Sequence, residues 1–163
     1  SLSMLYNRRY LERVLERIAR DQTTGVYGIM IDVNDFKHIN DAYGHAAGDR
    51  AVRHIARILS QSISAESLAV RYAGDEFVLL LRSAEPASIL ALVRQVEQNV
   101  ASWNESKQEP FTLSLAMGYS CFDPARMTPE EFLADMDRHM YENKRQHYQS
   151  HERMGLRETN AAD

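Results

Sequence analysis

Residues 68–81 read LAVRYAGDEFVLLL, and this stretch decides the fold. Leu68 to Tyr72 and Phe77 to Leu81 are two strand-like runs, and residues 73–76 are all that separates them. A connection this short, with a glycine to supply an unusual backbone angle, is typical of a β-hairpin. We therefore predict a hairpin whose tip carries two adjacent acids, Asp75 and Glu76.

The segments on either side of the hairpin show alternating helix and strand patterns. Residues 26–33 are nearly all apolar, which indicates a buried strand, and residues 111–119 alternate strictly, which indicates a half-buried strand. The polar stretch 34–48 is expected to be a loop. Apolar residues at helical spacing predict helices over 11–18, 52–63 and 89–100, and a capping box at 128–131 predicts the start of another. Because one hairpin interrupts the alternation, we expect an α/β (α+β) fold in the ferredoxin-like style.

Composition limits the class of protein. With 163 residues and 44% hydrophobic content, the chain can form one domain with a real core. We assign residues 1–148 to that domain and residues 149–163 to a polar, frayed tail. The net charge of −4 argues against a broad nucleic-acid or membrane surface, and the single cysteine, Cys121, excludes a disulfide framework. The absence of a long apolar run or leader pattern favours a cytoplasmic domain, belonging to a longer protein that is membrane-anchored or not.

Three acids mark a candidate metal site. Asp32 lies at the end of the predicted buried strand, and Asp75 and Glu76 lie at the hairpin tip. If the hairpin lies beside that strand, three carboxylates converge and need a cation to offset their repulsion. Oxygen ligands favour magnesium or manganese over zinc. Spacing alone does not separate this interpretation from one in which Asp75 and Glu76 are ordinary solvated turn residues.

The polar stretch 34–48 and the start of the helix after it carry a candidate nucleotide site. Asn40 offers donors and an acceptor, and Asp49 offers two acceptor oxygens, so the pair suits a guanine edge. Asp49 also stands near the start of the following helix. On the residues alone, a plain N-terminal cap is the favoured interpretation of Asp49.

Residues 71–77, RYAGDEF, resemble the RYGGDEF signature of GGDEF domains. Residues 5–9 resemble the entry motif of that family, residues 32–41 and 44–49 its two loop motifs, and residues 140–144 its C-terminal Met-Tyr-x-x-Lys. Five ordered matches across residues 4–148 are specific, whereas any one alone would be weak. The resemblance implies a nucleotidyl-cyclase palm, with a mostly antiparallel five-stranded sheet flanked by helices and the signature on a hairpin.

The resemblance also implies an activity and a set of roles. The activity is that of a diguanylate cyclase, which condenses two GTP molecules into cyclic di-GMP, releases pyrophosphate and works as a head-to-tail homodimer. Such a domain contacts neither nucleic acid nor membrane, and it is commonly fused to sensor or effector domains. The implied cofactor is Mg²⁺ or Mn²⁺, held by Asp32, the Val33 carbonyl, Asp75 and Glu76. The implied substrate-binding residues are Phe36 and Lys37 for phosphates, Asn40 and Asp49 for guanine, His45 for positioning and Lys144 for the terminal phosphates. The predicted catalytic residues are Asp75, Glu76 and Lys37.

Four departures from the family pattern qualify this prediction. Ala73 replaces the first signature glycine, which would cost stability if that position needed a positive φ, and Asn34 replaces a frequent aspartate. His147-Tyr148 stands where a Gly-Arg pair is usual. Residues 64–67, SAES, lack the arginine of the inhibitory Arg-x-x-Asp motif, so we expect no tight product inhibition there. The alternative function is a weak or inactive GTP-binding domain that regulates an attached phosphodiesterase or effector.

Overall fold

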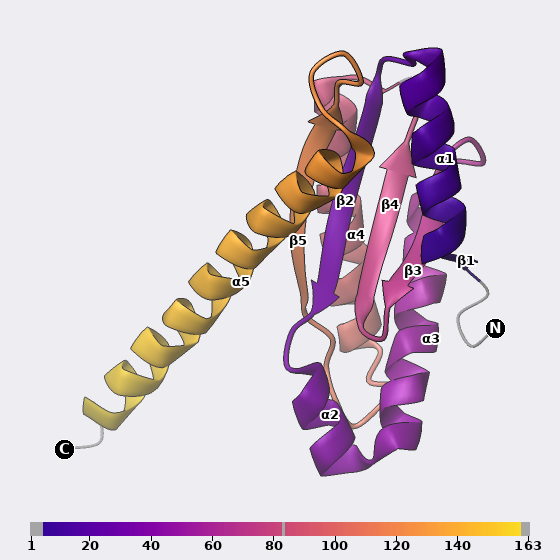
Figure 1. Ribbon diagram of the computed structural model, residues 1–163. Coiled ribbons are helices and arrows are strands. Elements are labelled where there is room, and N and C mark those ends of the chain that lie inside the picture. Colours follow the sequence, from indigo (N-terminus) through magenta and orange to yellow (C-terminus); the bar gives the residue numbers. More distant parts are fainter. Residues whose placement is uncertain (1–4, 83, 161–163) are drawn as a thin grey trace.

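A computed structural model describes the backbone of residues 5–82 and 84–160, and the side chains of these residues except 151 and 155–160. It is a five-stranded sheet covered by helices on both faces (Figure 1). In the described part of the chain, no helix is long and apolar enough to cross a membrane. The elements run in the order β1 Tyr6–Asn7, α1 Arg8–Asp21, β2 Val26–Val33, α2 Phe36–Tyr43, α3 His45–Ser62, β3 Leu68–Ala73, β4 Glu76–Leu81, α4 Pro86–Glu105, β5 Leu115–Phe122 and α5 Pro129–Asn160.

The sheet confirms the predicted fold class. Its strand order is β1-β3-β4-β2-β5, and every pairing is antiparallel except the short parallel contact of β1 with β3. β2 pairs with β4 on one side and β5 on the other. Seven of its eight residues are buried, which explains why the segment lacks alternation. Asp32, near the C-terminal end of β2, therefore lies at one end of the sheet, on a strand between β4 and β5.

Two apolar layers hold the helices against the sheet. On one face, α3 and α4 pack through residues such as Ile55, Leu59 and Val96. On the other face, α1 and α5 pack through residues such as Leu11, Leu15 and Phe132. Figure 1 shows α5 crossing the sheet and continuing well beyond it as a single long helix. The residues of α5 that follow the packed portion are thereby carried past the end of β2.

The predicted hairpin is present, and its turn is tighter than expected. β3 and β4 are joined by Gly74 and Asp75, with an irregular register between Arg71 and Ala73. Gly74 does not have a positive φ, so the prediction that it supplies an unusual angle is wrong. A Cβ built on Gly74 would have no atom within 4 Å, so the turn opens onto free space. Ala73 also lacks a positive φ, and its methyl group therefore adds no backbone strain.

Three local predictions need correction. Residues 34–48 contain a helix, α2, whose single buried residue, Ile39, leaves no apolar stripe to detect. Residues 111–114 are not part of β5, because the side-chain amide of Asn104 bonds both the N–H and the carbonyl of Leu113, at 2.8 Å each. The predicted frayed tail from residue 149 is helical as far as Asn160. The capping box is confirmed, with the Glu131 amide donating to Thr128 Oγ1 at 3.1 Å.

Candidate active site

The three predicted acids meet at the end of β2. Asp32 lies opposite Glu76 in the β2–β4 register, and the Val33 amide donates to the Asp75 carbonyl at 3.2 Å. The Asp32 residue is 7% exposed, and Asp75 and Glu76 are half-buried. Asp75 lies in the turn and Glu76 begins β4, and neither side chain is fully solvated.

The proximity of the acids changes their acidity. Burial raises the pKa of Asp75, and the charge of Asp32 and a hydrogen bond with it raise that pKa further. Burial likewise raises the pKa of Glu76, followed by the charges of Asp32, Asp137 and Asp75. Both carboxylates are thus held where their charged forms are unfavourable, which is an arrangement found at functional sites.

Lys144 brings a counter-charge from the far end of the chain. Its Nζ donates to Asp32 Oδ2 at 2.6 Å, and α5 carries it to this position. Burial opposes the charge on Lys144, but the hydrogen bond and the charge of Asp32 outweigh it and raise the pKa of the lysine. Lys144 therefore remains protonated beside the acids, where it can meet an anionic ligand.

The oxygen atoms of this cluster suit a hard divalent cation. Asp32 Oδ1 is buried and has no hydrogen-bond partner among the described residues, although a buried carboxylate oxygen normally has one. Within the same described part of the chain, no three His, Cys, Asp or Glu side chains are already arranged as a complete metal site. The donors at hand are the Asp32 and Asp75 carboxylates and the adjacent Val33 carbonyl. An all-oxygen set of this kind fits Mg²⁺ or Mn²⁺, with the remaining positions left to water or phosphate oxygens.

The start of α2 lies two residues beyond β2 and offers backbone donors. Asp35 precedes the helix with φ 57° and ψ 28°, and its side chain does not cap the helix. The first amides of a helix lack intrahelical acceptors, so those of Phe36 and Lys37 are available to an anion. Phe36 is half-buried and the Lys37 side chain is exposed. This terminus can thus contribute to a phosphate site beside the acidic cluster.

The predicted guanine residues lie where α2 and α3 meet. A Cβ on Gly48 would stand 1.9 Å from Asn40 Oδ1, so this glycine is what allows α3 to approach Asn40 so closely. Asp49 is exposed in the second turn of α3, which begins at His45 after Gly44 with no side-chain cap bond. The cap interpretation of Asp49 is therefore wrong, and its carboxylate is available to a ligand. His45 is exposed at the first position of α3.

Two contacts near the site escaped sequence reasoning. The Tyr148 hydroxyl donates to Asp35 Oδ1 at 3.2 Å, which ties α5 to the start of α2. Tyr148 lies one helical turn after Lys144, and that spacing was the available signal. Asn34 is buried, and its Nδ2 donates to Ser114 Oγ at 2.9 Å, so this side chain is held against the segment before β5.

Comparisons with known proteins bear on the family and the fold of the chain. The family model described as "Diguanylate cyclase, GGDEF domain" matches residues 1–150. The response regulator PleD of Caulobacter vibrioides is 30% identical over 155 residues, covering 88% of this chain and 33% of PleD. The diguanylate cyclase DosC of Escherichia coli is 32% identical over 127 residues, covering 75% of this chain and 28% of DosC. The chain thus spans about a third of the length of the curated relatives it matches.

Solved structures are similar in fold. A truncated Pseudomonas aeruginosa PA1120 (TpbB or YfiN) comprising only the GGDEF domain aligns with a TM-score of 0.81 at 33% identity, covering 90% of this chain and 88% of that one. The GGDEF domain of DgcB from Caulobacter crescentus, in complex with c-di-GMP, aligns with a TM-score of 0.80 at 21% identity, covering 89% and 88%. The second likeness bears on the fold alone.

Proposed function

This chain belongs to the GGDEF domain family, and from that premise we propose that it is a diguanylate cyclase, condensing two GTP molecules into cyclic di-GMP with release of pyrophosphate. The observation that carries the proposal is the convergence of Asp32 and Asp75 beside Lys144. A charged cluster of this kind, next to a helix N-terminus, suits a metal-bound triphosphate. We further propose that the domain acts in the cytoplasm as part of a longer protein.

The reaction joins a ribose 3′-hydroxyl to the α-phosphate of a second nucleotide. Asp32, Asp75 and the Val33 carbonyl would hold Mg²⁺ or Mn²⁺, with Glu76 supporting a second ion. When bound, these ions supply positive charge to the attacking and leaving oxygens. Asp75 or Glu76 would accept the hydroxyl proton.

The cationic side chains and the backbone amides of the chain would bind the phosphates that leave as pyrophosphate. The amides of Phe36 and Lys37 would bind phosphate oxygens at the start of α2, and the Lys37 side chain would offset charge that develops during transfer. Lys144 would turn from Asp32 toward the terminal phosphates. One domain holds one GTP, so two copies must face each other, head to tail, for each hydroxyl to meet the phosphate of the other.

Guanine selection would rest on Asn40 and Asp49. The Asp49 carboxylate can accept from the N1–H and amino group of guanine, which adenine does not present in the same pattern. Asn40 lies against Gly48, the residue before Asp49, where α2 and α3 approach closely. His45, at the start of α3, would help to position the nucleotide.

A second candidate function is a GTP-binding domain that regulates an attached phosphodiesterase or effector. It is favoured by Tyr148, which replaces a cationic phosphate ligand with a neutral phenol already bonded to Asp35. Ala73 no longer supports this alternative, because it carries no backbone strain.

Tight product inhibition through residues 64–67 is not part of the proposal. Ser64 and Ser67 bond each other through their hydroxyls at 3.3 Å, and neither offers the arginine fork of a tight product-inhibition site.

A turnover measurement on an enforced dimer separates the two functions. The chain is fused after a parallel coiled coil, incubated with GTP and Mg²⁺, and assayed for cyclic di-GMP by chromatography. We expect product from the parent and none from Asp75→Asn. Asp21→Asn, the same charge change on an exposed residue at the end of α1, is the matched control and should retain turnover. An enforced dimer that binds GTP with Mg²⁺ yet forms no product would refute the cyclase and favour the regulatory domain.

A further inference from the structure

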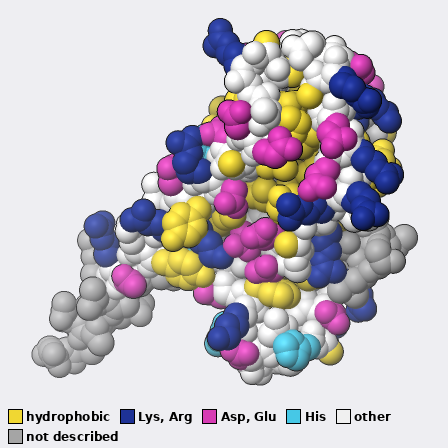
Figure 2. Space-filling view, viewed as in Figure 1, with side chains coloured by type: hydrophobic (Ala, Val, Ile, Leu, Met, Phe, Trp, Pro, Cys, Tyr) yellow, Lys and Arg dark blue, Asp and Glu magenta, His cyan; other side chains and the backbone are white. Residues whose placement is uncertain are grey.

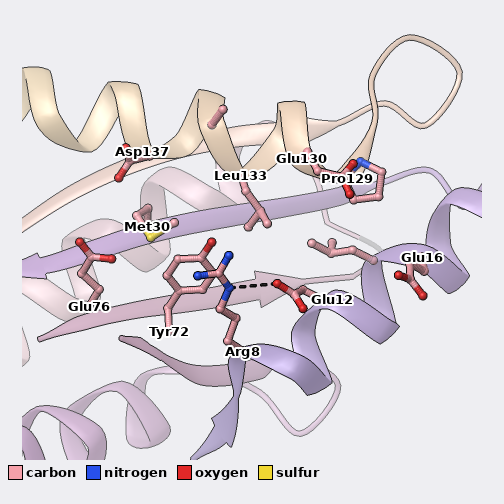
Figure 3. Close-up of a pocket in the computed structure, with 12 residues that line it drawn as sticks. Arg8, Glu12, Glu16, Met30, Tyr72, Glu76, Pro129, Glu130, Leu133 and Asp137 are labelled. Atoms are coloured by element: carbon pink, nitrogen blue, oxygen red, sulfur yellow. Dashed lines mark hydrogen bonds and ion pairs between the residues drawn. The ribbon is translucent and has the colours of Figure 1, made fainter. Parts of the chain in front are cut away.

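A second cleft adjoins the candidate active site, between α1 and α5 and above the sheet, and shares Glu76 with it (Figure 3). Its volume is about 670 Å³, within the range of small-ligand pockets. Leu15 and Met30, both buried, contribute to its floor, and Leu133 and Tyr72 complete an apolar surface. Figure 2 shows an apolar stretch on this face, with acidic side chains around it and Lys and Arg side chains along one border. No role proposed above uses the cleft as a whole.

The charge of the lining is strongly one-sided. Five acids and one base line the cleft, and the base, Arg8, is already bonded to Glu12 at 2.9 Å and lies over the Tyr72 ring at 4.7 Å. The other four acids form no ion pair with any described residue. Figure 3 shows Glu76 and Asp137 toward one end of the cleft and Glu16 and Glu130 toward the other. The four unpaired acids are Glu16, Glu76, Glu130 and Asp137.

The spacing of Glu130 and Asp137 along α5 gives the distance between the two acidic ends of the cleft. Glu130 and Asp137 are seven residues apart on α5, which places them on the same face of the helix. At a rise of about 1.5 Å per residue, the separation along the axis is about 10 Å. Between them, Leu133 points its apolar side chain into the cleft, as Figure 3 shows. The cleft thus presents negative charge, apolar surface and negative charge again along one line.

We propose that this cleft binds a linear aliphatic diamine or polyamine with terminal ammonium groups about 10 Å apart. The ammonium groups would lie at the two acidic ends, and the methylene chain would cover Leu133 and Met30. An anionic ligand is excluded by the charge of the lining, and a neutral apolar ligand would gain no attraction from the four acids, of which Glu16, Glu130 and Asp137 are exposed.

The test is a direct binding measurement on the whole chain without GTP, so it is independent of the proposed cyclase activity. Isothermal titration with 1,8-diaminooctane, 1,4-diaminobutane and octylamine is carried out at low ionic strength, where screening is weak. We expect the eight-carbon diamine to bind most tightly, since it alone spans both ends. Equal affinity for the four-carbon diamine, or no detectable binding of the eight-carbon diamine, would overturn the proposal.

Paired variants locate the site. Glu16→Gln with Glu130→Gln should weaken binding of 1,8-diaminooctane at least about five-fold, because one end loses both charges. Glu97→Gln with Glu105→Gln makes the same charge change on α4, on the opposite face of the sheet, and should leave binding unchanged. Far-UV circular dichroism checks that each variant is folded. An equal loss in both pairs would mean diffuse attraction to an acidic protein and would overturn the assignment to the cleft.

Discussion

Replacing Lys144 with methionine should destabilise the metal-free protein, although the lysine is assigned to substrate binding. Its Nζ lies 2.6 Å from Asp32 Oδ2, while Asp32 Oδ1 already lacks a hydrogen-bond partner among the described residues. Methionine keeps most of the side-chain volume and removes the charge. The variant therefore leaves Asp32 without its ion-pair partner and removes the positive charge of Lys144, which also acts on Asp75 and Glu76.

The magnitude follows from the burial of the pair. The Lys144 and Asp32 side chains are 23% and 10% exposed, so the pair lies between a surface ion pair and a buried one. Breaking a buried pair costs roughly 3–5 kcal/mol, and an exposed pair contributes about 0–1 kcal/mol. We expect an intermediate loss of about 2 kcal/mol, equivalent to a fall in Tm of about 6 °C for a chain of this size.

Urea unfolding followed by circular dichroism measures this loss, first with EDTA and then with 10 mM Mg²⁺. Added Mg²⁺ should recover part of the stability of Lys144→Met, because a cation bound by the acids stabilises the folded state by mass action. Arg145→Met removes a positive charge from the adjacent exposed position and should change little. A loss below about 0.5 kcal/mol for Lys144→Met, or equal losses for the two variants, would refute the reasoning.

Three further predictions concern the same region. Asp75→Asn should raise the unfolding free energy of the metal-free protein at pH 7 while removing turnover. Folding raises the pKa of Asp75 and Glu76, so the unfolding free energy of the parent should fall as pH rises from their unfolded pKa values through their folded ones. Urea unfolding over a pH series should show a weaker dependence of the unfolding free energy on pH in the variant. Asp49→Ala should weaken GTP binding much more than ATP binding in a titration, and an equal loss for both would contradict guanine recognition. Gly118→Ala should destabilise the fold by about 3 kcal/mol or more in urea unfolding, because the alanine Cβ would stand 2.0 Å from the Met140 backbone nitrogen. A stability near that of the parent would contradict this and show that α5 can move away.

The elements that were predictable from sequence are those determined by neighbouring residues. The hairpin at 73–76, the buried strand ending at Asp32 and the capping box at Thr128 each have their cause within a few positions. α2 was missed for the same reason, because one buried residue, Ile39, gives no periodic stripe. The segment before β5 was misassigned because burial of Phe111 and Leu113 produces alternation without strand pairing.

The parts of the site that depend on distant contacts were less accessible. Sequence reasoning required the hairpin to lie beside β2, but the register that sets Asp32 opposite Glu76 is a property of the assembled sheet. The pairing of Lys144 with Asp32 joins residues 112 positions apart and depends on how α5 packs across β5. Close packing at Gly118, where backbone meets backbone, is one determinant of that path.

The energetics of the acidic cluster also bear on whether the domain is a nucleotide site or only a scaffold. Burial and mutual repulsion raise the pKa values of Asp75 and Glu76, so keeping both ionised at neutral pH lowers the stability of the fold. A single change to asparagine would relieve most of that strain at Asp75 while preserving its shape. A domain that served as a scaffold would gain from such a change and lose nothing. A domain that must hold a divalent cation against a triphosphate needs the unfavourable charge, since the repulsion between the carboxylates is what the cation relieves. The presence of all three acids, with Lys144 as their counter-charge, therefore favours a site for a metal-bound triphosphate, which both proposed functions require, over simple scaffolding.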